Sequence, residues 1–251
     1  MAMGLQGRTA VIIGGNGAIG AATAGALAGM GARIILVDRE GEGDRARMQA
    51  TLAGLPGSGH RVATADILDH GSLTQLRDSL AIDCESLSIL VNAAGFTKPV
   101  AHADLDALDD ALIDDIFRVN WRAQFATIRA FAPLLKASGD GLVVSISSIA
   151  AFTAVGSNIA YCAAKAGIDV MTKALARALA PEIRVLAVSP GVVDTAFVPG
   201  RGADFNARVE ASTPLGRIAT PHDIADAILA CATHLRYSTG HIVQVDGGRA
   251  L

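Results

Sequence analysis

Residues 9–30 read TAVIIGGNGAIGAATAGALAGM, and this stretch predicts the fold of the chain. Thr9–Ile13 is a short β-branched run typical of a buried strand, and the Ala-rich run Ile19–Met30 is typical of a helix. The turn between them holds three glycines spaced as Gly-x-Gly-x-x-Gly, at Gly15, Gly17 and Gly20. Strand, glycine turn and helix in this order indicate a dinucleotide site, because glycines let backbone amides approach a pyrophosphate at a helix N-terminus. The structural alternative is a tight turn that needs glycines only for its geometry. No Gly-Lys-Ser/Thr follows the turn, which argues against a phosphate-loop NTPase.

The same alternation of strand and helix continues to the end of the chain. Short apolar, β-branched runs predict strands at Thr9–Ile13, Arg33–Val37, Arg61–Ala65, Ser88–Val91, Gly141–Ile146, Ile183–Val188 and His241–Val245. Ala- and Leu-rich segments predict helices at Ile19–Met30, Glu42–Leu55, Ser72–Leu80, Asp104–Ala137, Ser157–Ala180 and Pro221–Thr233. Apolar strands without strict alternation indicate a sheet buried on both faces, and alternating strands and helices indicate parallel pairing. We therefore predict a single α/β domain over residues 1–251, with a Rossmann-type, doubly wound, mainly parallel seven-stranded sheet and helices on both faces.

Composition narrows the classes of protein that fit. The chain has 251 residues, of which 51% are hydrophobic and 18% charged, so a globular core is expected rather than disorder. A formal net charge of -3 and 4% aromatic residues argue against nucleic acid or an anionic membrane as partner. The widely spaced Cys84, Cys162 and Cys231 suit a reducing compartment. The N-terminal residues do not resemble a signal peptide and no apolar run is long enough to cross a bilayer, so we expect a cytoplasmic protein.

A carboxylate at the end of the second predicted strand bears on the choice of dinucleotide. Asp38 lies eighteen residues after Gly20. A carboxylate there can accept hydrogen bonds from the ribose hydroxyls of an adenosine and would repel a 2′-phosphate, which favours NAD over NADP. Arg39 follows directly and could offset that repulsion. An ordinary loop carboxylate or helix cap is the alternative for Asp38.

The segment Ser157–Pro181 predicts one long helix that carries two unusual residues. Ser157 or Asn158 can act as the N-cap, and Pro181 cannot extend the helix. Tyr161 and Lys165 are four residues apart and therefore share a helix face. A nearby ammonium favours the phenolate and lowers the pKa of a tyrosine, which makes its hydroxyl a usable acid or base. A surface pair without function is the alternative.

Further motifs follow in order along the chain. They are Asp66 in ATADILD, Asn92-Ala93-Ala94-Gly95, Asn120 in FRVNW, Ser148 thirteen residues before Tyr161, Tyr161-x-x-x-Lys165, Pro190-Gly191-Val192-Val193-Asp194-Thr195 and the C-terminal Tyr237–Gly248. Together with Ile13–Gly20, these motifs resemble those of the short-chain dehydrogenase/reductase family, in the single-domain branch that includes 3-oxoacyl-carrier-protein reductases. The resemblance covers essentially the whole chain. Ile13, Ala18, Ala93 and Leu186 depart from the family pattern, at positions that affect local geometry more than chemistry.

The resemblance implies a role for each matched residue. It implies a catalytic set of Asn120, Ser148, Tyr161 and Lys165, with Ser147 as the rejected neighbour of the catalytic serine. It implies a cofactor site made of Gly14, Asn16, Gly17, Ala18, Ile19, Gly20, Asp38, Arg39, Asp66, Ile67, Asn92, Ala93, Ala94, Gly95, Tyr161, Lys165, Pro190, Gly191, Val193 and Thr195. The structural alternatives are a helix cap for Ser148, a backbone-bonded amide for Asn120 and a solvated charge for Lys165.

These roles imply an NAD-dependent oxidoreductase that interconverts a secondary alcohol and a ketone, with Tyr161 as acid and base. By resemblance, Lys165 also holds the nicotinamide ribose, and Asn120 anchors a water that relays protons. A 3-hydroxyacyl or 3-oxoacyl thioester is one substrate class; polyols, hydroxy acids and alicyclic or steroid alcohols are alternatives. A non-catalytic, NAD-binding redox-responsive regulator is the alternative of another class. The resemblance also implies a homotetramer or homodimer.

Two remaining segments are interpreted from their residues alone. The segment 195–214 is long for a connection, and we expect a mobile substrate lid in which Phe197, Val198 and Phe205 form an apolar wall. Arg201 or Arg208 could meet an anionic group of the substrate, and solvated arginines are the alternative. The six aspartates within residues 104–115 are interpreted as a solvated face, and we expect no metal site.

Overall fold

The computed structural model describes residues 4–41, 43–83, 87–199 and 204–251. Its seven strands form one sheet in the order β3-β2-β1-β4-β5-β6-β7, and every neighbouring pair is parallel. The strands are β1 Thr9–Ile13, β2 Arg33–Asp38, β3 Arg61–Thr64, β4 Ile89–Asn92, β5 Gly141–Ile146, β6 Ile183–Pro190 and β7 Ile242–Val245. The predicted doubly wound α/β fold is confirmed. The order reverses at β1, where the chain crosses from one half of the sheet to the other and where such sheets bind ligands.

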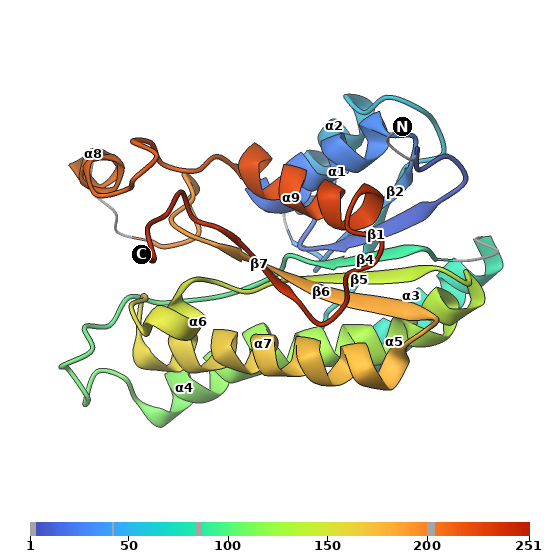
Figure 1. Cartoon of the computed structure of the whole chain (residues 1–251). Helices are drawn as coiled ribbons and strands as arrows, with labels where there is room; N and C mark the ends of the chain where they lie inside the picture. The colour runs from blue at the N-terminus through green and yellow to red at the C-terminus, as the bar shows by residue number, and fades with distance from the viewer. Residues whose placement is uncertain (1–3, 42, 84–86, 200–203) are drawn as a thin grey trace.

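Helices cover both faces of this sheet (Figure 1). They are α1 Ala18–Gly29, α2 Asp44–Ala53, α3 His70–Asp83, α4 Asp110–Phe117, the π-helical turn η1 Arg118–Arg122, α5 Ala123–Ala137, α6 Ala150–Thr153, α7 Ile159–Leu179, α8 Asp204–Ala211 and α9 Pro221–Thr233. One layer contains α1, α2 and α9, and the opposite layer contains α3, α4, α5 and α7 (Figure 1). The sheet is therefore the middle of three layers.

The core follows from the two-residue period of the strands. In β1, Ile12 belongs to the cluster under α1 and α9, whereas Val11 and Ile13 belong to the cluster under α3, α5 and α7. All five residues of β1 are buried. Because both faces are covered, the strands are apolar throughout, as expected of a parallel sheet. Each fully buried Val or Ile side chain contributes about 1.5–3 kcal/mol through removal of apolar surface from water.

The predicted helix over Asp104–Ala137 is wrong at its start and in its middle. The helix begins at Asp110, capped by the Asp109 carboxylate, which accepts a hydrogen bond from the Leu112 amide at 2.8 Å. Upstream, the Asp104 carboxylate accepts from the Ala107 amide at 3.2 Å, so a side chain competes for the backbone donors that a helix would use. The π turn η1 then separates α4 from α5. The short helices α6 and α8 were not predicted, and Glu42 in the predicted second helix lies outside the described residues.

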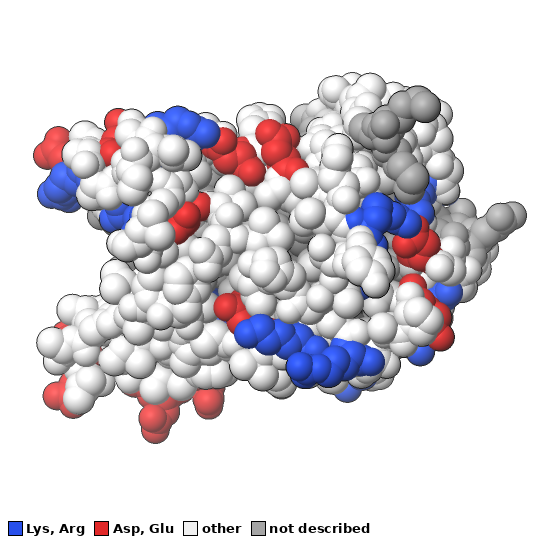
Figure 2. All heavy atoms as spheres, in the orientation of Figure 1, with Lys and Arg blue, Asp and Glu red and all other residues white. Residues whose placement is uncertain are grey.

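Charged side chains are scattered over the face seen in Figure 2, where small groups of either sign are separated by uncharged surface. The acidic groups at the lower left belong to the region of α4 in Figure 1. All six aspartates of residues 104–115 are exposed, in agreement with a solvated face. Among the described residues, no helix combines the length and the apolar character that a membrane crossing requires.

Candidate active site

The carboxyl ends of the parallel strands bring the predicted site residues to one edge of the sheet. Residues directly after β1, β4, β5 and β6 supply the glycine turn, the Asn-Ala-Ala-Gly loop, Ser148 and the Pro-Gly turn. Contacts join these segments in pairs. The Gly14 backbone packs on Ala94, and the Ile149 amide donates to the Pro190 carbonyl at 3.0 Å. The predicted site residues therefore gather at the same edge of the sheet.

The glycine turn packs closely against the protein backbone at the start of α1. Gly14 has φ +82°, and a Cβ there would lie 2.6 Å from the Ala94 nitrogen. A Cβ at Gly20 would lie 2.3 Å from the Gly14 carbonyl oxygen, so the turn can pack against the helix only with glycine at this position. Gly17 is the N-cap, so no side chain caps the helix, and the first turn of α1 carries no acidic residue. The first amides of α1, at Ala18 and Ile19, are therefore placed to bind an anionic group.

The end of β2 lies beside this turn. Asp38 is the last residue of β2, and its carboxylate accepts hydrogen bonds from the Asn16 amide at 3.1 Å and the Arg39 amide at 2.9 Å. The Asn16 side chain is fixed in turn by Asp44, to which it donates at 2.8 Å. A carboxylate has about four lone-pair sites, so Asp38 can still accept from a ribose. The Arg39 side chain is exposed.

The loop after β3 carries the next predicted residues. The exposed Asp66 carboxylate accepts from the Leu68 amide at 2.8 Å, and the Ser72 hydroxyl accepts from the Asp66 amide at 2.9 Å. Ile67 packs against the core under α3 and α5. The loop is therefore held in one conformation with Asp66 facing solvent.

The loop after β4 is tied to η1 by Asn120. The Asn120 amide nitrogen donates to the Phe96 carbonyl at 2.7 Å and to the Ile116 carbonyl at 2.9 Å, and its oxygen accepts from the Phe96 amide at 3.2 Å. This supports the alternative of a backbone-bonded amide: the side chain braces the loop against the π turn. Asn92 is buried at the end of β4 and accepts from the Thr127 hydroxyl at 2.7 Å.

Tyr161 and Lys165 lie one turn apart on α7, as predicted. Asn158 caps this helix: its oxygen accepts from the Tyr161 amide at 2.7 Å, and its nitrogen donates to the Lys98 carbonyl at 2.8 Å. The Lys165 ammonium lies 5.5 Å from the centre of the Tyr161 ring. Capping thus fixes the first turn of α7, and with it Tyr161, against the loop after β4.

Lys165 is buried, so the alternative that it is a solvated charge is wrong. It is 2% exposed, and its amine donates to the Ile146 carbonyl at 2.7 Å. Burial lowers the pKa of Lys165 to about 7, because the charged form loses its water, and the Asp169 carboxylate acts in the opposite direction. The amine can therefore gain or lose a proton near neutral pH.

The two serines after β5 differ in their surroundings. The Ser148 hydroxyl is half-buried and accepts from the Ala150 amide at 3.2 Å, which leaves its proton available. Ser147 is 1% exposed, and its hydroxyl donates to the Asp169 carboxylate at 2.6 Å. The rejection of Ser147 as the substrate-facing serine agrees with this geometry. Sequence reasoning missed the Ser147–Asp169 contact, and no motif spacing signals it.

The segment after β6 closes the site on its remaining side. Gly191 packs against Asp246, and Val193 is buried and forms a bridge with Ala219. Beyond Thr195, the Phe197 ring lies 6.2 Å from the Tyr161 ring, and a Cβ on Gly95 would lie 3.4 Å from it. Phe197 therefore provides apolar surface near the Tyr161 ring. Arg201 lies outside the described residues, and Arg208 is exposed on α8.

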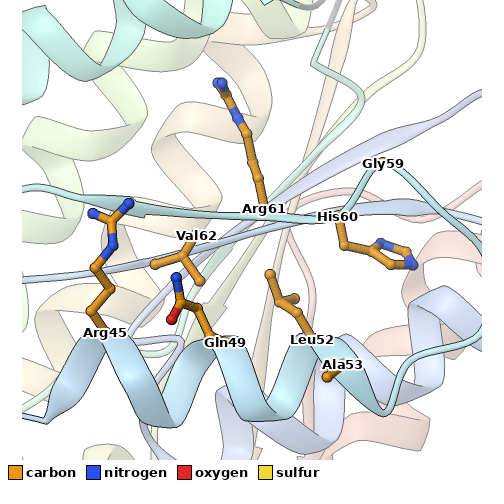
Figure 3. Close-up of a pocket in the computed structure, with 8 residues that line it drawn as sticks. All are labelled: Arg45, Gln49, Leu52, Ala53, Gly59, His60, Arg61 and Val62. Carbon is orange, nitrogen blue, oxygen red and sulfur yellow. The ribbon is translucent and has the colours of Figure 1, made fainter.

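A hollow of about 510 Å³ lies away from this site, between α2 and β3 (Figure 3). Arg45 and Gln49 extend from α2 towards the strand, while the Arg61 side chain points away from the helix. None of the predicted catalytic or cofactor residues lines it. Within the described part of the chain, no group of three His, Cys, Asp or Glu side chains is arranged to hold a metal ion.

Comparisons with known proteins agree with this arrangement. The family model described as "Enoyl-(Acyl carrier protein) reductase" matches residues 14–250. The chain belongs to the short-chain dehydrogenase/reductase family. The family consists of oxidoreductases that typically use a nicotinamide cofactor.

Relatives in this family act on different alcohols. The cis-4-hydroxycyclohexanecarboxylate dehydrogenase of Sinomonas cyclohexanicum is 36% identical over 96% of both chains. The D-threitol dehydrogenase of Mycolicibacterium smegmatis is 34% identical over 97% of this chain and 93% of its own. Among solved structures, a short-chain dehydrogenase/reductase of Brucella melitensis, titled a glucose/ribitol dehydrogenase, has a TM-score of 0.86 and 28% identity over 99% of both chains.

Proposed function

We propose that this short-chain dehydrogenase/reductase interconverts a secondary alcohol and a ketone with NAD, using Tyr161 as the proton donor and acceptor. The observation that carries the proposal is the buried Lys165 amine, 5.5 Å from the Tyr161 ring and bonded to the Ile146 carbonyl. A buried cation is costly unless it is paired with an opposite charge and hydrogen-bonded. A phenol that exchanges protons with a substrate needs a neighbouring cation, because a protonated amine favours the phenolate.

The glycine turn supports the cofactor half of the proposal. Gly14 and Gly20 remove side chains that would fill the turn, and the uncapped start of α1 presents amides to an anion. Asp38 would hold the adenosine ribose, and its charge would disfavour a 2′-phosphate. When bound, the nicotinamide ring supplies or accepts the hydride. The chain would hold this ring near Pro190–Thr195 and leave the proton to its own side chains.

The proton would move through groups of this chain alone. In oxidation, the Tyr161 oxygen takes the proton of the alcohol, and the Ser148 hydroxyl donates a hydrogen bond to the same substrate oxygen. Lys165 stabilises the phenolate that accepts this proton. Asn120 contributes by bracing the loop after β4, because its amide hydrogens are bonded to the Phe96 and Ile116 carbonyls. In reduction the same proton returns from Tyr161 to the ketone oxygen.

Phe197 favours a substrate with an apolar body. Its ring centre lies 6.2 Å from that of Tyr161, so a substrate bound at Tyr161 would have an aromatic surface nearby. The similarity to a hydroxycyclohexanecarboxylate dehydrogenase agrees with such a substrate, and we propose alicyclic alcohols as the first class to test. Hydroxyacyl thioesters, hydroxy acids and polyols follow. We propose that residues 195–199 and 204–214 belong to a lid over this substrate; residues 200–203 of the expected lid lie outside the described residues.

The testing experiment uses a panel of alicyclic alcohols, 3-hydroxyacyl thioesters, hydroxy acids and polyols. It measures NADH formation with NAD and NADPH formation with NADP. The proposal predicts turnover of at least one secondary alcohol, higher with NAD. Asp38→Ala should reduce the preference for NAD, with Asp66→Ala as the matched carboxylate control. Binding of NADH without turnover of any panel member would favour the redox-responsive regulator. Equal discrimination in wild type and Asp38→Ala would remove Asp38 as the selector.

A further inference from the structure

A buried pair outside the predicted catalytic set links the two segments that carry it. The Ser147 hydroxyl donates to the Asp169 carboxylate at 2.6 Å and lies 3.4 Å from the Lys165 carbonyl oxygen. Ser147 stands directly after the last residue of β5, and Asp169 stands one turn after Lys165 on α7. The pair therefore joins the end of β5 to the middle of α7.

The residues on either side of Ser147 give this link its importance. Ile146 supplies the carbonyl that accepts from the Lys165 amine at 2.7 Å, and Ser148 is the proposed substrate-facing serine. Any slide of β5 along α7 would change both contacts at once. The relative placement of Ser148 and Lys165 thus depends on what holds these two elements together.

Charge gives Asp169 a second effect. Burial raises the pKa of Asp169, whereas the Ser147 hydroxyl from the segment after β5, and Lys173 and Lys165 from α7, favour the charged carboxylate. The β5 segment itself, GLVVSI, contains no charged residue. Burial lowers the pKa of Lys165 to about 7, and Asp169 is the group that opposes this shift. The proposed mechanism needs the protonated amine, so this opposition matters at neutral pH.

We propose that Ser147 and Asp169 are positioning residues that hold the end of β5 against α7 and place a carboxylate one turn along α7 from the buried Lys165. This inference rests on the proposed function, since it assigns the pair a role in the Tyr161 chemistry. Ser147 contributes mainly geometry and Asp169 mainly charge. The two contributions can be separated by substitution.

Asp169→Asn tests the charge, because an amide oxygen can still accept from Ser147. Without the carboxylate, Lys165 should lose its proton at lower pH, and Tyr161 should ionise only at higher pH. The rising limb of kcat/KM against pH for alcohol oxidation should therefore move upward by about one pH unit. Asp140→Asn is the matched control: it removes a carboxylate at the other end of β5 and should leave this limb in place.

Three results would overturn the proposal. They are an unchanged limb in Asp169→Asn, an equal shift in Asp140→Asn, and a limb in Asp169→Glu that moves as far as in Asp169→Asn although glutamate keeps the carboxylate. Should Asp169→Asn fail to fold, Ser147→Ala carries the test. It should lower kcat more than it raises KM, and a kcat equal to that of wild type would contradict the positioning role.

The same assays separate this inference from the proposed function. Tyr161→Phe should be inactive in either case. If it is inactive and the Asp169→Asn profile is unchanged, the positioning role fails and the function stands. If Tyr161→Phe keeps its activity, the proposed function itself fails, whatever Asp169→Asn shows.

Discussion

A charged side chain lies at each end of strand β5, and the two side chains differ in the partners that they bind. At the amino end, Asp140 precedes the strand and forms ion pairs with Arg8 and Arg236. At the carboxyl end, Ile146 accepts from Lys165, which is buried with a backbone carbonyl as its hydrogen-bond acceptor. One end pairs its charge with opposite charges, and the other leaves a cation with a neutral acceptor.

The pKa values of Asp140 and Lys165 differ in the same way. Burial raises the pKa of Asp140, but the hydrogen bonds from Arg236 and Arg8 outweigh it, so the net pKa lies below its usual value. Burial lowers the pKa of Lys165 to about 7, and Asp169 only partly opposes this. Perturbed pKa values that come from incomplete pairing in a cleft often mark functional groups, whereas well-paired charges are often structural. We therefore assign chemistry to the carboxyl end and stability to the amino end.

Lys165→Met should show the largest effect. Met keeps most of the apolar stem but removes the charge that stabilises the Tyr161 phenolate, so alcohol oxidation should fall about 10²–10⁴-fold, the usual contribution of positioned proton transfer. The measurement is kcat/KM for the best panel substrate. Lys173→Met, an exposed lysine on the same helix, is the control and should stay close to wild type. Similar losses in both variants would contradict a specific role for Lys165.

The same variant should change how stability depends on pH. The pKa of Lys165 in the folded state, about 7, lies below its unfolded value near 10.4, so the folded state binds fewer protons between these limits. Stability of the cofactor-free wild type should therefore rise with pH in this window, by at most about 1.4 kcal/mol per pH unit from this group. Urea unfolding of wild type and Lys165→Met at pH 7, 8 and 9 would measure the difference. A constant difference across these pH values would speak against a depressed pKa.

Asp140→Ala should act on stability and not on chemistry. It removes the shared partner of Arg8 and Arg236 and leaves these guanidinium groups close to Arg184, whose pKa is lowered by burial and then by Arg236. Because the carboxylate is partly exposed, we expect a loss of about 1–2 kcal/mol at pH 7.

The sign of the pH effect follows from the lowered pKa of Asp140. Its stabilisation is present above the unfolded pKa, about 3.9, and is lost as pH falls through the folded pKa. Wild type and Asp140→Ala should therefore converge in stability in acid. Chemical denaturation at pH 7 and pH 3 measures this. If Asp140→Ala is fully folded but has a lower kcat/KM, the assignment of stability alone to the amino end of β5 is contradicted.

Thr220→Ala should have the smallest effect on stability and should alter neither end of β5. The Thr220 hydroxyl caps α9 by accepting from the Asp223 amide, and the Asp223 carboxylate accepts from the Thr220 amide at 2.7 Å. Loss of this N-cap should cost about 1 kcal/mol. Thermal unfolding would show the loss, and unchanged kcat/KM would confirm that it is confined to α9. Thr220→Ser keeps the cap and should retain most of the stability.

Periodicity and motif order predicted most of the architecture. Each predicted strand lies within two residues of the observed one, because apolar β-branched runs and the turns between them are local signals. The predicted helix start at Asp104 was wrong. The Asp104 and Asp109 carboxylates accept hydrogen bonds from nearby amides, and the helix begins at Asp110. The π turn at Arg118–Arg122 has no local composition that marks it.

Only those residues of the candidate site that belong to a sequence motif could be predicted. Tyr161 and Lys165 share a helix face by spacing alone, and Asn158 was a candidate cap. The Ser147–Asp169 contact joins residues that are 22 apart in sequence and belong to different elements, so it depends on how α7 packs on the sheet. Burial of Lys165 is also a tertiary property, since a lysine in an Ala-rich helix is usually at the surface.

The most direct test of the account compares wild type and Tyr161→Phe with one secondary alcohol that the wild type oxidises. Both proteins are first titrated with NADH, so that cofactor binding and folding are known for each. The account predicts similar NADH affinity and a loss of turnover of about 10²–10⁴-fold in Tyr161→Phe. Turnover close to that of wild type, with NADH still bound, would contradict the assignment of Tyr161 as the proton donor and acceptor.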